Sequence, residues 1–184
     1  MPGGSSDPPG NMNLFNWLKS LMPKRKRIHS GYDIHFVTFS VNKHIPVFRE
    51  SLIARSFIEN LDFYSEKGLF RLHAYVVMPD HVHLLMELPD NGKISDLVRD
   101  IKKYFSYRVK NKLSRDTNLD LRRFFSKGNF QFWERGFDEV TIRSEYVYKI
   151  KLEYIINNPV KAGLVNKSED YPFLFVGRFE EMRI

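Results

Sequence analysis

The order of apolar and polar positions predicts a strand, a helix and a strand pair in the first half of the chain. Residues 33–41 are rich in β-branched and aromatic side chains that alternate along the chain, which is typical of a strand. Residues 47–66 repeat apolar side chains at helical spacing up to a Lys-Gly pair, which indicates a helix. The apolar runs 69–77 and 81–88 are separated by Met-Pro-Asp, and they are predicted to be two paired strands.

The second half of the chain is predicted to add a basic helix, a strand and a last helix. Ser95 can cap a helix over residues 96–112, and residues 130–137 have the aromatic alternation of a strand. Ser144 can cap a final helix that ends near Pro159, because the residue before a proline disfavours the helical conformation. The resulting order, strand-helix-strand-strand-helix-strand-helix, predicts an α+β domain with a split βαβ arrangement and an antiparallel sheet.

Composition limits the classes of protein. The 184 residues are 42% hydrophobic, which is enough for one domain with a core. Lys and Arg number 29 against 22 Asp and Glu, and this net charge of +7 favours an anionic partner, with nucleic acid ahead of an acidic membrane surface. The absence of cysteine excludes disulfides, thiolate metal sites and a cysteine nucleophile.

No part of the sequence predicts a membrane protein or a secreted one. The apolar stretches are interrupted by charges before the roughly 20 residues that a membrane span requires, and a signal-peptide pattern is missing. We therefore expect a soluble, cytoplasmic protein. Composition divides the chain into an extension over residues 1–30, a folded domain over 31–176 and a tail over 177–184. The extension ends with a basic run, and we expect a solvated linker there, with a DNA-contacting arm as the alternative.

His81 and His83 are the first candidates for chemistry. Because side chains alternate along a strand, both imidazoles leave the same face of the sheet. Two neutral imidazoles side by side suit a divalent metal ion, and the alternative is a pair of polar residues on a solvated face. Placing them in an otherwise apolar strand loses burial, which favours the metal site.

Tyr154 and Asn158 are the second pair of candidates. They are four residues apart in a predicted helix and therefore share one of its faces. The amide oxygen of Asn158 can complete a metal site built from imidazole and oxygen, and Tyr154 offers an oxygen nucleophile. The alternative is an ordinary amphipathic-helix aromatic followed by a helix-ending residue before a proline.

The helix predicted over residues 96–112 combines cationic and aromatic side chains. Cations that follow phosphates and aromatics that stack on bases are the usual means of holding single-stranded nucleic acid. The alternative is a solvated helix face with part of its aromatic side chains in the core. The predicted DNA-binding residues are Lys102, Lys103, Tyr104, Tyr107, Arg108 and Lys110.

Three sequence runs carry a resemblance to a known family. The runs 73–85 (HAYVVMPDHVHLL), 132–137 (FWERGF) and 154–165 (YIINNPVKAGLV) are similar to those of the REP-associated tyrosine transposases, which are relatives of the single-tyrosine insertion-sequence transposases. The similarity extends from about residue 32 to about residue 175, and three motifs in the same order are more specific than any one of them.

The resemblance implies a ferredoxin-like HUH domain that cleaves and rejoins single-stranded or hairpin DNA through a 5′-phosphotyrosine. It implies that His81, His83 and Asn158 hold Mg²⁺ or Mn²⁺ and that Tyr154 on a late helix is the nucleophile. The insertion-sequence relatives are dimers, whereas the REP-associated branch has been suggested to act as a monomer, so a homodimer stays open. Two alternatives also stay open: a non-catalytic nucleic-acid-binding regulator, and a metal-dependent phosphoesterase that uses activated water.

Overall fold

The computed structural model describes residues 33–117 and 119–177. The extension predicted for residues 1–30 and all but the first residue of the predicted tail lie outside these residues, so the division into extension, domain and tail stays a prediction. Within the described residues, no helix is both long enough and apolar enough to cross a membrane.

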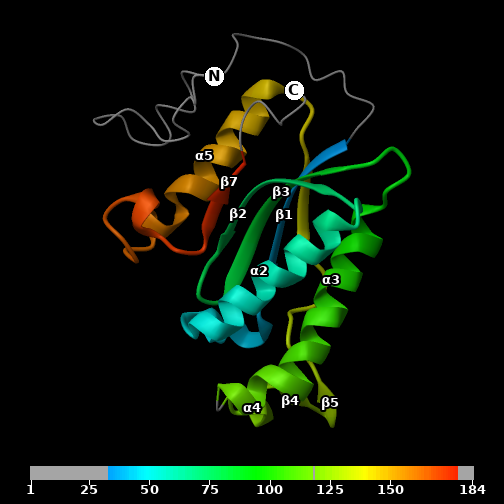
Figure 1. Cartoon of the computed structure of the whole chain (residues 1–184), viewed down its shortest axis with the longest axis vertical. Coiled ribbons are helices and arrows are strands. Elements are labelled where there is room, and N and C mark those ends of the chain that lie inside the picture. The colour runs from blue at the N-terminus through cyan, green and yellow to red at the C-terminus, as the bar shows by residue number, and fades with distance from the viewer. Residues whose placement is uncertain (1–32, 118, 178–184) are drawn as a thin grey trace, which may run out of the picture.

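A five-stranded antiparallel sheet forms the centre of the domain, with the strand order β6-β1-β3-β2-β7 (Figure 1). The strands are β1 (Asp33–Ser40), β2 (Arg71–Val77), β3 (His81–Leu88), β6 (Asp138–Thr141) and β7 (Leu174–Val176). Apart from β7, the sheet has the ferredoxin-like order, in which β1 and β3 lie between β6 and β2. The predicted fold class is therefore confirmed. The edge strand β7, which pairs with β2, was not predicted.

Three helices cover the two faces of the sheet (Figure 1). α2 (Ser51–Glu66) and α3 (Ile94–Arg108) pack on one face, and α5 (Glu145–Lys161) packs on the other. A smaller lobe lies beyond one end of the sheet, where the helical segment that follows α3 meets a short hairpin. Its elements are a π-helical turn (Val109–Leu113), α4 (Ser114–Asp116), β4 (Phe125–Ser126) and β5 (Asn129–Phe130).

The pleat of β3 decides which side chains face which helices. Even-numbered residues of this strand, such as Val82 and Leu84, belong to the core under α2 and α3. Leu85 belongs to the core under α5. Because side chains alternate, His81 and His83 lie on the same face as Leu85. Both histidines therefore face the layer that contains α5.

Aromatic side chains dominate the core under α2 and α3. Phe57 of α2 contacts Phe48, Phe105 and Trp133, with ring centroids 5.0 to 5.6 Å apart. Phe39 of β1 stacks edge-on against Trp133 at 4.9 Å. Such pairs add to the free energy gained by burial, so this cluster fixes the helices on the sheet.

Three boundaries predicted from the sequence were wrong. Ser95 does not cap α3, which begins at Ile94 with Lys93 at the N-cap and without a side-chain cap. Helical structure does not end at residue 112 but continues through the π-helical turn into α4. The helix predicted to begin at residue 47 opens with a 3-10 turn, and α2 itself starts at Ser51 with the Glu50 side chain as its cap.

The strand predicted over residues 130–137 was also wrong. Only Asn129–Phe130 pairs there, as β5, and Trp133 adds a single bridge to Val41. Phe132 and Trp133 are adjacent in sequence yet both buried, at 1% and 5% exposure, so the chain cannot keep the alternation of a strand. The strand that pairs with β1 at this edge of the sheet is β6, which starts two residues after Gly136, a glycine in the left-handed region (φ 71°).

The final helix starts as predicted and ends later. Ser144 caps α5, since its side chain accepts a hydrogen bond from the amide of Val147. The helix does not end near Pro159 but runs to Lys161. Pro159 is buried inside the helix, and this burial outweighs the backbone preference that favoured an earlier end.

The aromatic cluster gives the first prediction. We expect Phe57→Ala to lower the free energy of unfolding by about 3–5 kcal/mol, because a fully buried ring leaves a cavity. Leu52→Ala is the matched control, since Leu52 lies on the same helix and is 42% exposed. Urea denaturation of both variants measures the difference, and equal destabilisation would contradict the packing described above.

Candidate active site

His81 and His83 form an imidazole pair at the start of β3. Their ring centroids lie 4.8 Å apart, with the rings nearly perpendicular. His83 is buried at 4% exposure, while the His81 side chain is a quarter exposed. The structure therefore brings together the two histidines that the sequence singled out, on the face that the strand alternation predicted.

Tyr154 of α5 packs directly on this pair. Its ring centroid lies 4.9 Å from that of His83, in an edge-to-face contact. Phe36 of β1 supports both rings, because it stacks on His83 at 5.6 Å and meets Tyr154 edge-on at 5.8 Å. Tyr154 itself is 40% exposed. The phenol is thus held beside the imidazoles and still open to a substrate.

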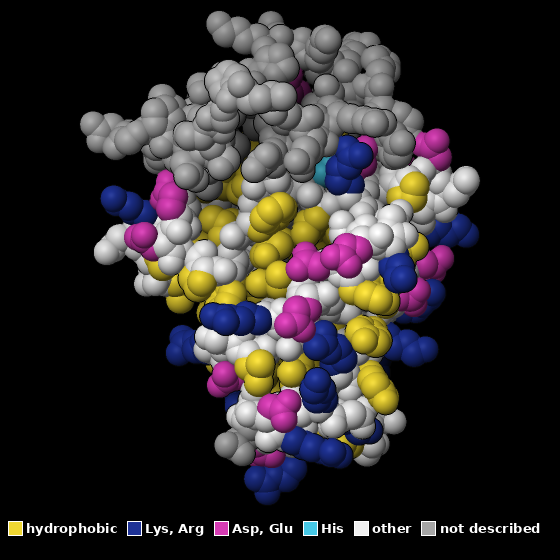
Figure 2. Space-filling view, viewed as in Figure 1, with side chains coloured by type: hydrophobic (Ala, Val, Ile, Leu, Met, Phe, Trp, Pro, Cys, Tyr) yellow, Lys and Arg dark blue, Asp and Glu magenta, His cyan; other side chains and the backbone are white. Residues whose placement is uncertain are grey.

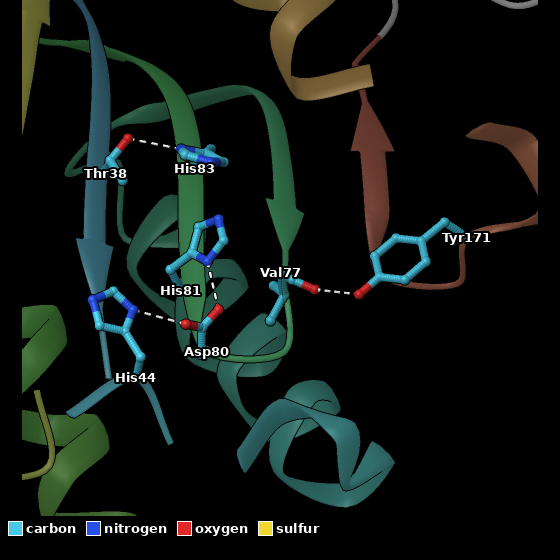
Figure 3. Close-up of polar contacts among 7 residues, drawn as sticks. All are labelled: Thr38, His44, Val77, Asp80, His81, His83 and Tyr171. Carbon is cyan, nitrogen blue, oxygen red and sulfur yellow. Dashed lines mark hydrogen bonds and ion pairs between the residues drawn. The ribbon is translucent and has the colours of Figure 1, made fainter. Parts of the chain in front are cut away.

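Asp80 and Thr38 orient the two imidazoles (Figure 3). The Nδ1 atom of His81 lies 2.7 Å from one carboxyl oxygen of Asp80, and the Nδ1 atom of His44 lies 2.7 Å from the other. Burial raises the pKa of Asp80, but the hydrogen bonds from His81 and His44 outweigh burial and hold it below its usual value. The ionised carboxylate accepts from His81 Nδ1, so Nε2 is the ring nitrogen that this contact leaves available.

The Nε2 atom of His83 has no hydrogen-bond partner among the described residues. Nδ1 of His83 shares a hydrogen bond of 2.7 Å with Thr38 Oγ1, whereas Nε2 is buried and unpaired within the part of the chain that the structure describes. Burial, with the nearby charges of His81 and Lys151, lowers the pKa of His83 to about 3, so the ring is neutral at pH 7. A neutral imidazole with an unpaired buried nitrogen is suited to binding a metal ion.

Asn158 lies one turn beyond Tyr154 on α5 and is half-buried. Within the described residues its side chain forms no hydrogen bond with either histidine. Nor do these residues contain a group of three His, Cys, Asp or Glu side chains that could hold a metal ion. A metal site here would therefore rest on two imidazoles, and its other ligands would be amide, substrate or water oxygens.

A buried polar network holds α5 against the sheet on the N-terminal side of Tyr154. His73 of β2 contacts the Tyr148 hydroxyl through Nδ1 at 3.1 Å and Glu87 through Nε2 at 2.9 Å. All three residues are at most 3% exposed, and burial raises the pKa of Tyr148. Beyond α5, the Tyr171 hydroxyl donates to the carbonyl of Val77 at 2.8 Å (Figure 3). The helix that carries Tyr154 is thus held near its start, and the segment that follows it is held against β2.

The predicted DNA-binding residues of the basic helix fall into two groups. Lys102 donates to the carbonyls of Glu134 and Gly136, and burial lowers its pKa. Arg108 donates to Ser56 and pairs with Glu59. These two cations are engaged within the fold. The four exposed residues are Lys103, Tyr104, Tyr107 and Lys110.

Tyr104 and Tyr107 line a shallow cavity of about 420 Å³ between α2 and α3. This cavity lies on the side of the sheet opposite α5, because α2 and α3 cover the other face. The predicted single-stranded DNA surface on α3 therefore does not adjoin Tyr154, and the six residues remain untested as a DNA-binding set.

Sequence reasoning missed three residues of the site. Asp80 and Thr38 hold the imidazoles, and Lys151 lies one turn before Tyr154 on α5. Thr38 could be found only from the register of β1 and β3, which places it opposite His83. The spacing of Lys151 and Tyr154, three residues apart in a helix, was a usable signal.

The ferredoxin-like sheet with a histidine pair facing a helix tyrosine defines an HUH-type domain. More particularly, the chain belongs to the family described as "Transposase IS200 like", which matches residues 29–158.

Two curated relatives carry a narrower name. A REP-associated tyrosine transposase of Escherichia coli is 31% identical over 105 residues, covering 56% of this chain and 53% of that protein. A Haemophilus influenzae protein provisionally given the same name is 33% identical over 105 residues, covering 56% of this chain and 57% of that protein. The chain thus matches little more than half the length of these relatives.

A solved structure supports the fold. It is a REP-associated tyrosine transposase bound to a REP hairpin, with a TM-score of 0.58 and 24% identity, covering 83% of this chain and 82% of that chain. At this level of identity the similarity establishes the fold of the chain.

The contacts of Lys102 give the second prediction. We expect Lys102→Met to lower the free energy of unfolding by about 1–3 kcal/mol, because two loop carbonyls lose their donor. Lys103→Met removes the same charge from the exposed neighbouring position and should change stability little. Thermal and urea denaturation measure both variants. Equal stability of the two would mean that Lys102 is free for another role.

Proposed function

We propose that the chain is a metal-dependent tyrosine transposase that cleaves and transfers single-stranded DNA through a 5′-phosphotyrosine. One observation carries this proposal: an accessible tyrosine on a helix lies in ring contact with a buried histidine whose Nε2 atom has no partner within residues 33–117 and 119–177. A protein that only binds nucleic acid has no need for a nucleophile beside an imidazole pair. Membership of the IS200-like family supports the same reading.

The residues present fit a divalent cation. His81 and His83 would hold it through their Nε2 atoms, and Asn158 would supply an oxygen from the same helix as Tyr154. Asp80 and Thr38 would keep both rings in the required orientation, as partners of metal-binding histidines commonly do. We infer Mg²⁺ or Mn²⁺, because phosphate chemistry uses oxygen-preferring cations. When bound, such a cation reduces the repulsion between phenol oxygen and phosphate and stabilises the charge of the transition state.

Tyr154 performs the covalent step. Its phenolic oxygen attacks the scissile phosphorus, the new bond joins that oxygen to phosphorus, and the bond from phosphorus to the 3′ oxygen breaks. The phenolic proton passes to water, and the departing 3′ oxygen takes up a proton to become a hydroxyl. The phosphotyrosine keeps the energy of the broken bond, so another 3′ hydroxyl can reverse the step without ATP.

The substrate we propose is hairpin DNA with a single-stranded flank. The solved relative that shares the fold is bound to a REP hairpin. One chain supplies both parts of the site, since Tyr154 already contacts His83 of the same chain. The proposed cleavage therefore needs no second copy, although a homodimer is compatible with it.

The third prediction tests the nucleophile. Wild-type protein incubated with labelled hairpin DNA and Mn²⁺ should form a covalent adduct that survives denaturation, and Tyr154→Phe should abolish it because the attacking oxygen is gone. Tyr146→Phe is the matched control, since Tyr146 lies on the same helix and is 74% exposed. Gel electrophoresis after denaturation gives the readout.

Each alternative function has its own outcome in this assay. Cleavage that continues in Tyr154→Phe without an adduct would indicate a phosphoesterase that uses activated water. Hairpin binding without any cleavage, with Mg²⁺ and with Mn²⁺, would indicate a non-catalytic regulator. Loss of the adduct in EDTA and in His83→Ala, with binding retained, would support the metal requirement.

A further inference from the structure

Lys151 lies inside the aromatic arrangement that surrounds the candidate nucleophile. Its ammonium nitrogen is 4.6 Å from the centroid of the Phe36 ring. The same ring stacks on His83 and meets the edge of Tyr154. The Phe36 ring therefore brings the ammonium of Lys151, the phenol of Tyr154 and the imidazole of His83 into one cluster.

Helical spacing places Lys151 in line with the other candidates of α5. Lys151, Tyr154 and Asn158 are separated by three and four residues, so they follow one another along one face of the helix. The stripe presents an ammonium, a phenol and an amide in that order, with Tyr154 in the middle. Of the other basic residues of α5, Lys149 lies on a different face, and Lys161 follows Tyr154 on this face but two turns later, at the exposed end of the helix.

Lys151 has no acidic partner among the described residues. Lys149, two residues earlier, pairs with Glu145. Within the part of the chain that the structure describes, no carboxylate lies within ion-pair distance of Lys151, and its side chain is half-buried. A half-buried ammonium beside a phenol, held only against an aromatic ring, can still pair with an incoming anion. A DNA phosphate approaching Tyr154 is such an anion.

We propose that Lys151 is a catalytic residue that contacts a non-bridging oxygen of the scissile phosphate and stabilises the charge that develops as Tyr154 attacks. This inference rests on the proposed tyrosine transferase function. Lys151 stays protonated throughout, so it adds no proton transfer to the step: the bond from Tyr154 to phosphorus forms and the bond to the 3′ oxygen breaks as before. Preplaced positive charge of this kind accelerates reactions at phosphorus.

The fourth prediction separates this role from a structural contact with Phe36. Adduct formation is timed at saturating hairpin DNA, and DNA affinity is measured separately for each variant. We expect Lys151→Met, which keeps the aliphatic stem, to slow the adduct step about 100-fold while DNA affinity changes less than about threefold. Lys151→Arg keeps the charge and should recover most of the rate. Lys161→Met removes the same charge from the exposed end of α5 and should match the wild type.

Each outcome decides the matter. A wild-type rate in Lys151→Met overturns the role, as does an equal loss in Lys151→Met and Lys151→Arg, which would indicate packing alone. A wild-type chain that forms no adduct overturns the proposed function, and the role of Lys151 with it. A normal wild-type adduct with an unaffected Lys151→Met variant overturns only the present inference.

A second and independent observation concerns the lobe beyond the end of the sheet, residues 109–130. Its sequence holds six Lys and Arg against two Asp, a net charge of +4 out of +7 for the whole chain. Figure 2 shows Lys and Arg side chains gathered at this end of the molecule. Of the six, only Arg122 has a carboxylate partner among the described residues, which is Asp120. The unpaired cations are Lys110, Lys112, Arg115, Arg123 and Lys127.

The basic lobe is a packed part of the domain and adjoins the histidine end of the sheet. Phe124 is fully buried, and the ammonium of Lys110 lies 5.7 to 5.8 Å from the ring centroids of Phe125 and Phe130. The carbonyl of Arg123 accepts from the Lys43 side chain. Lys43 precedes His44, whose imidazole donates to Asp80. These contacts link the lobe to the end of the sheet that carries the imidazole pair.

We infer that the basic lobe binds the phosphate backbone of the duplex stem of the hairpin. Exposed, uncompensated cations on a rigid support are the means by which proteins bind a duplex without reading its sequence. The inference rests on the proposed function, and it assigns the duplex to the lobe rather than to the outer face of α3.

The fifth prediction is a salt titration of hairpin binding in a Tyr154→Phe background, so that the result does not depend on cleavage. Substituting Lys112, Arg115 and Lys127 by Gln should weaken binding at least about 10-fold and reduce the slope of log K against log salt by about 2–3, near 0.9 for each lost phosphate contact. The matched control substitutes Arg55, Lys67 and Lys93 by Gln, which removes three exposed cations elsewhere. An equal change of slope in both triple variants, or none in either, would overturn the inference.

Discussion

The pleat of the central strand β3 is the constraint on which the rest of the structure depends. Its even-numbered side chains fill the aromatic core under α2 and α3, while its odd-numbered side chains place His81 and His83 toward α5. Pairing with β1 sets Thr38 opposite His83. A shift of one residue in this register would exchange the two faces, burying the imidazoles among aromatic rings and exposing apolar side chains. Stability of the core and geometry of the site are therefore fixed by the same strand.

The α5 layer converts this strand geometry into a site. Two kinds of contact set the position of α5 on the sheet. Its inner residues are buried in the core, and Tyr148 is bonded into the network with His73 and Glu87. In that position the Tyr154 ring contacts His83, whose Nε2 atom is buried without a partner in the part of the chain that the structure describes. An unpaired buried nitrogen costs free energy, so the fold maintains an arrangement that a bound ligand would relieve.

Much of this could be predicted from the sequence, and the failures have physical causes. The elements with clear periodicity, β1, β2, β3 and α2, were predicted because each is amphipathic or apolar over many residues. Residues 130–137 failed because two adjacent aromatics are both drawn into the core, and the end of α5 failed because burial of Pro159 outweighs its backbone preference. In the site, the histidine pair and Tyr154 follow from local spacing. Asp80 directly precedes His81, so its role was open to prediction, whereas Thr38 and the surroundings of Lys151 depend on contacts between elements far apart in the chain.

The two edge strands of the sheet precede and follow α5 in the chain, and this limits how far the helix can move. β6 precedes the helix and pairs with β1, and β7 follows it and pairs with β2, so both connections of α5 return to the one sheet. The helix that carries Tyr154 is thus tied to the sheet through the strands on both sides of it in the chain. In the proposed reaction the DNA end bound to Tyr154 would be held close to the sheet. Exchange of strands would then require the free 3′ end to move relative to the protein.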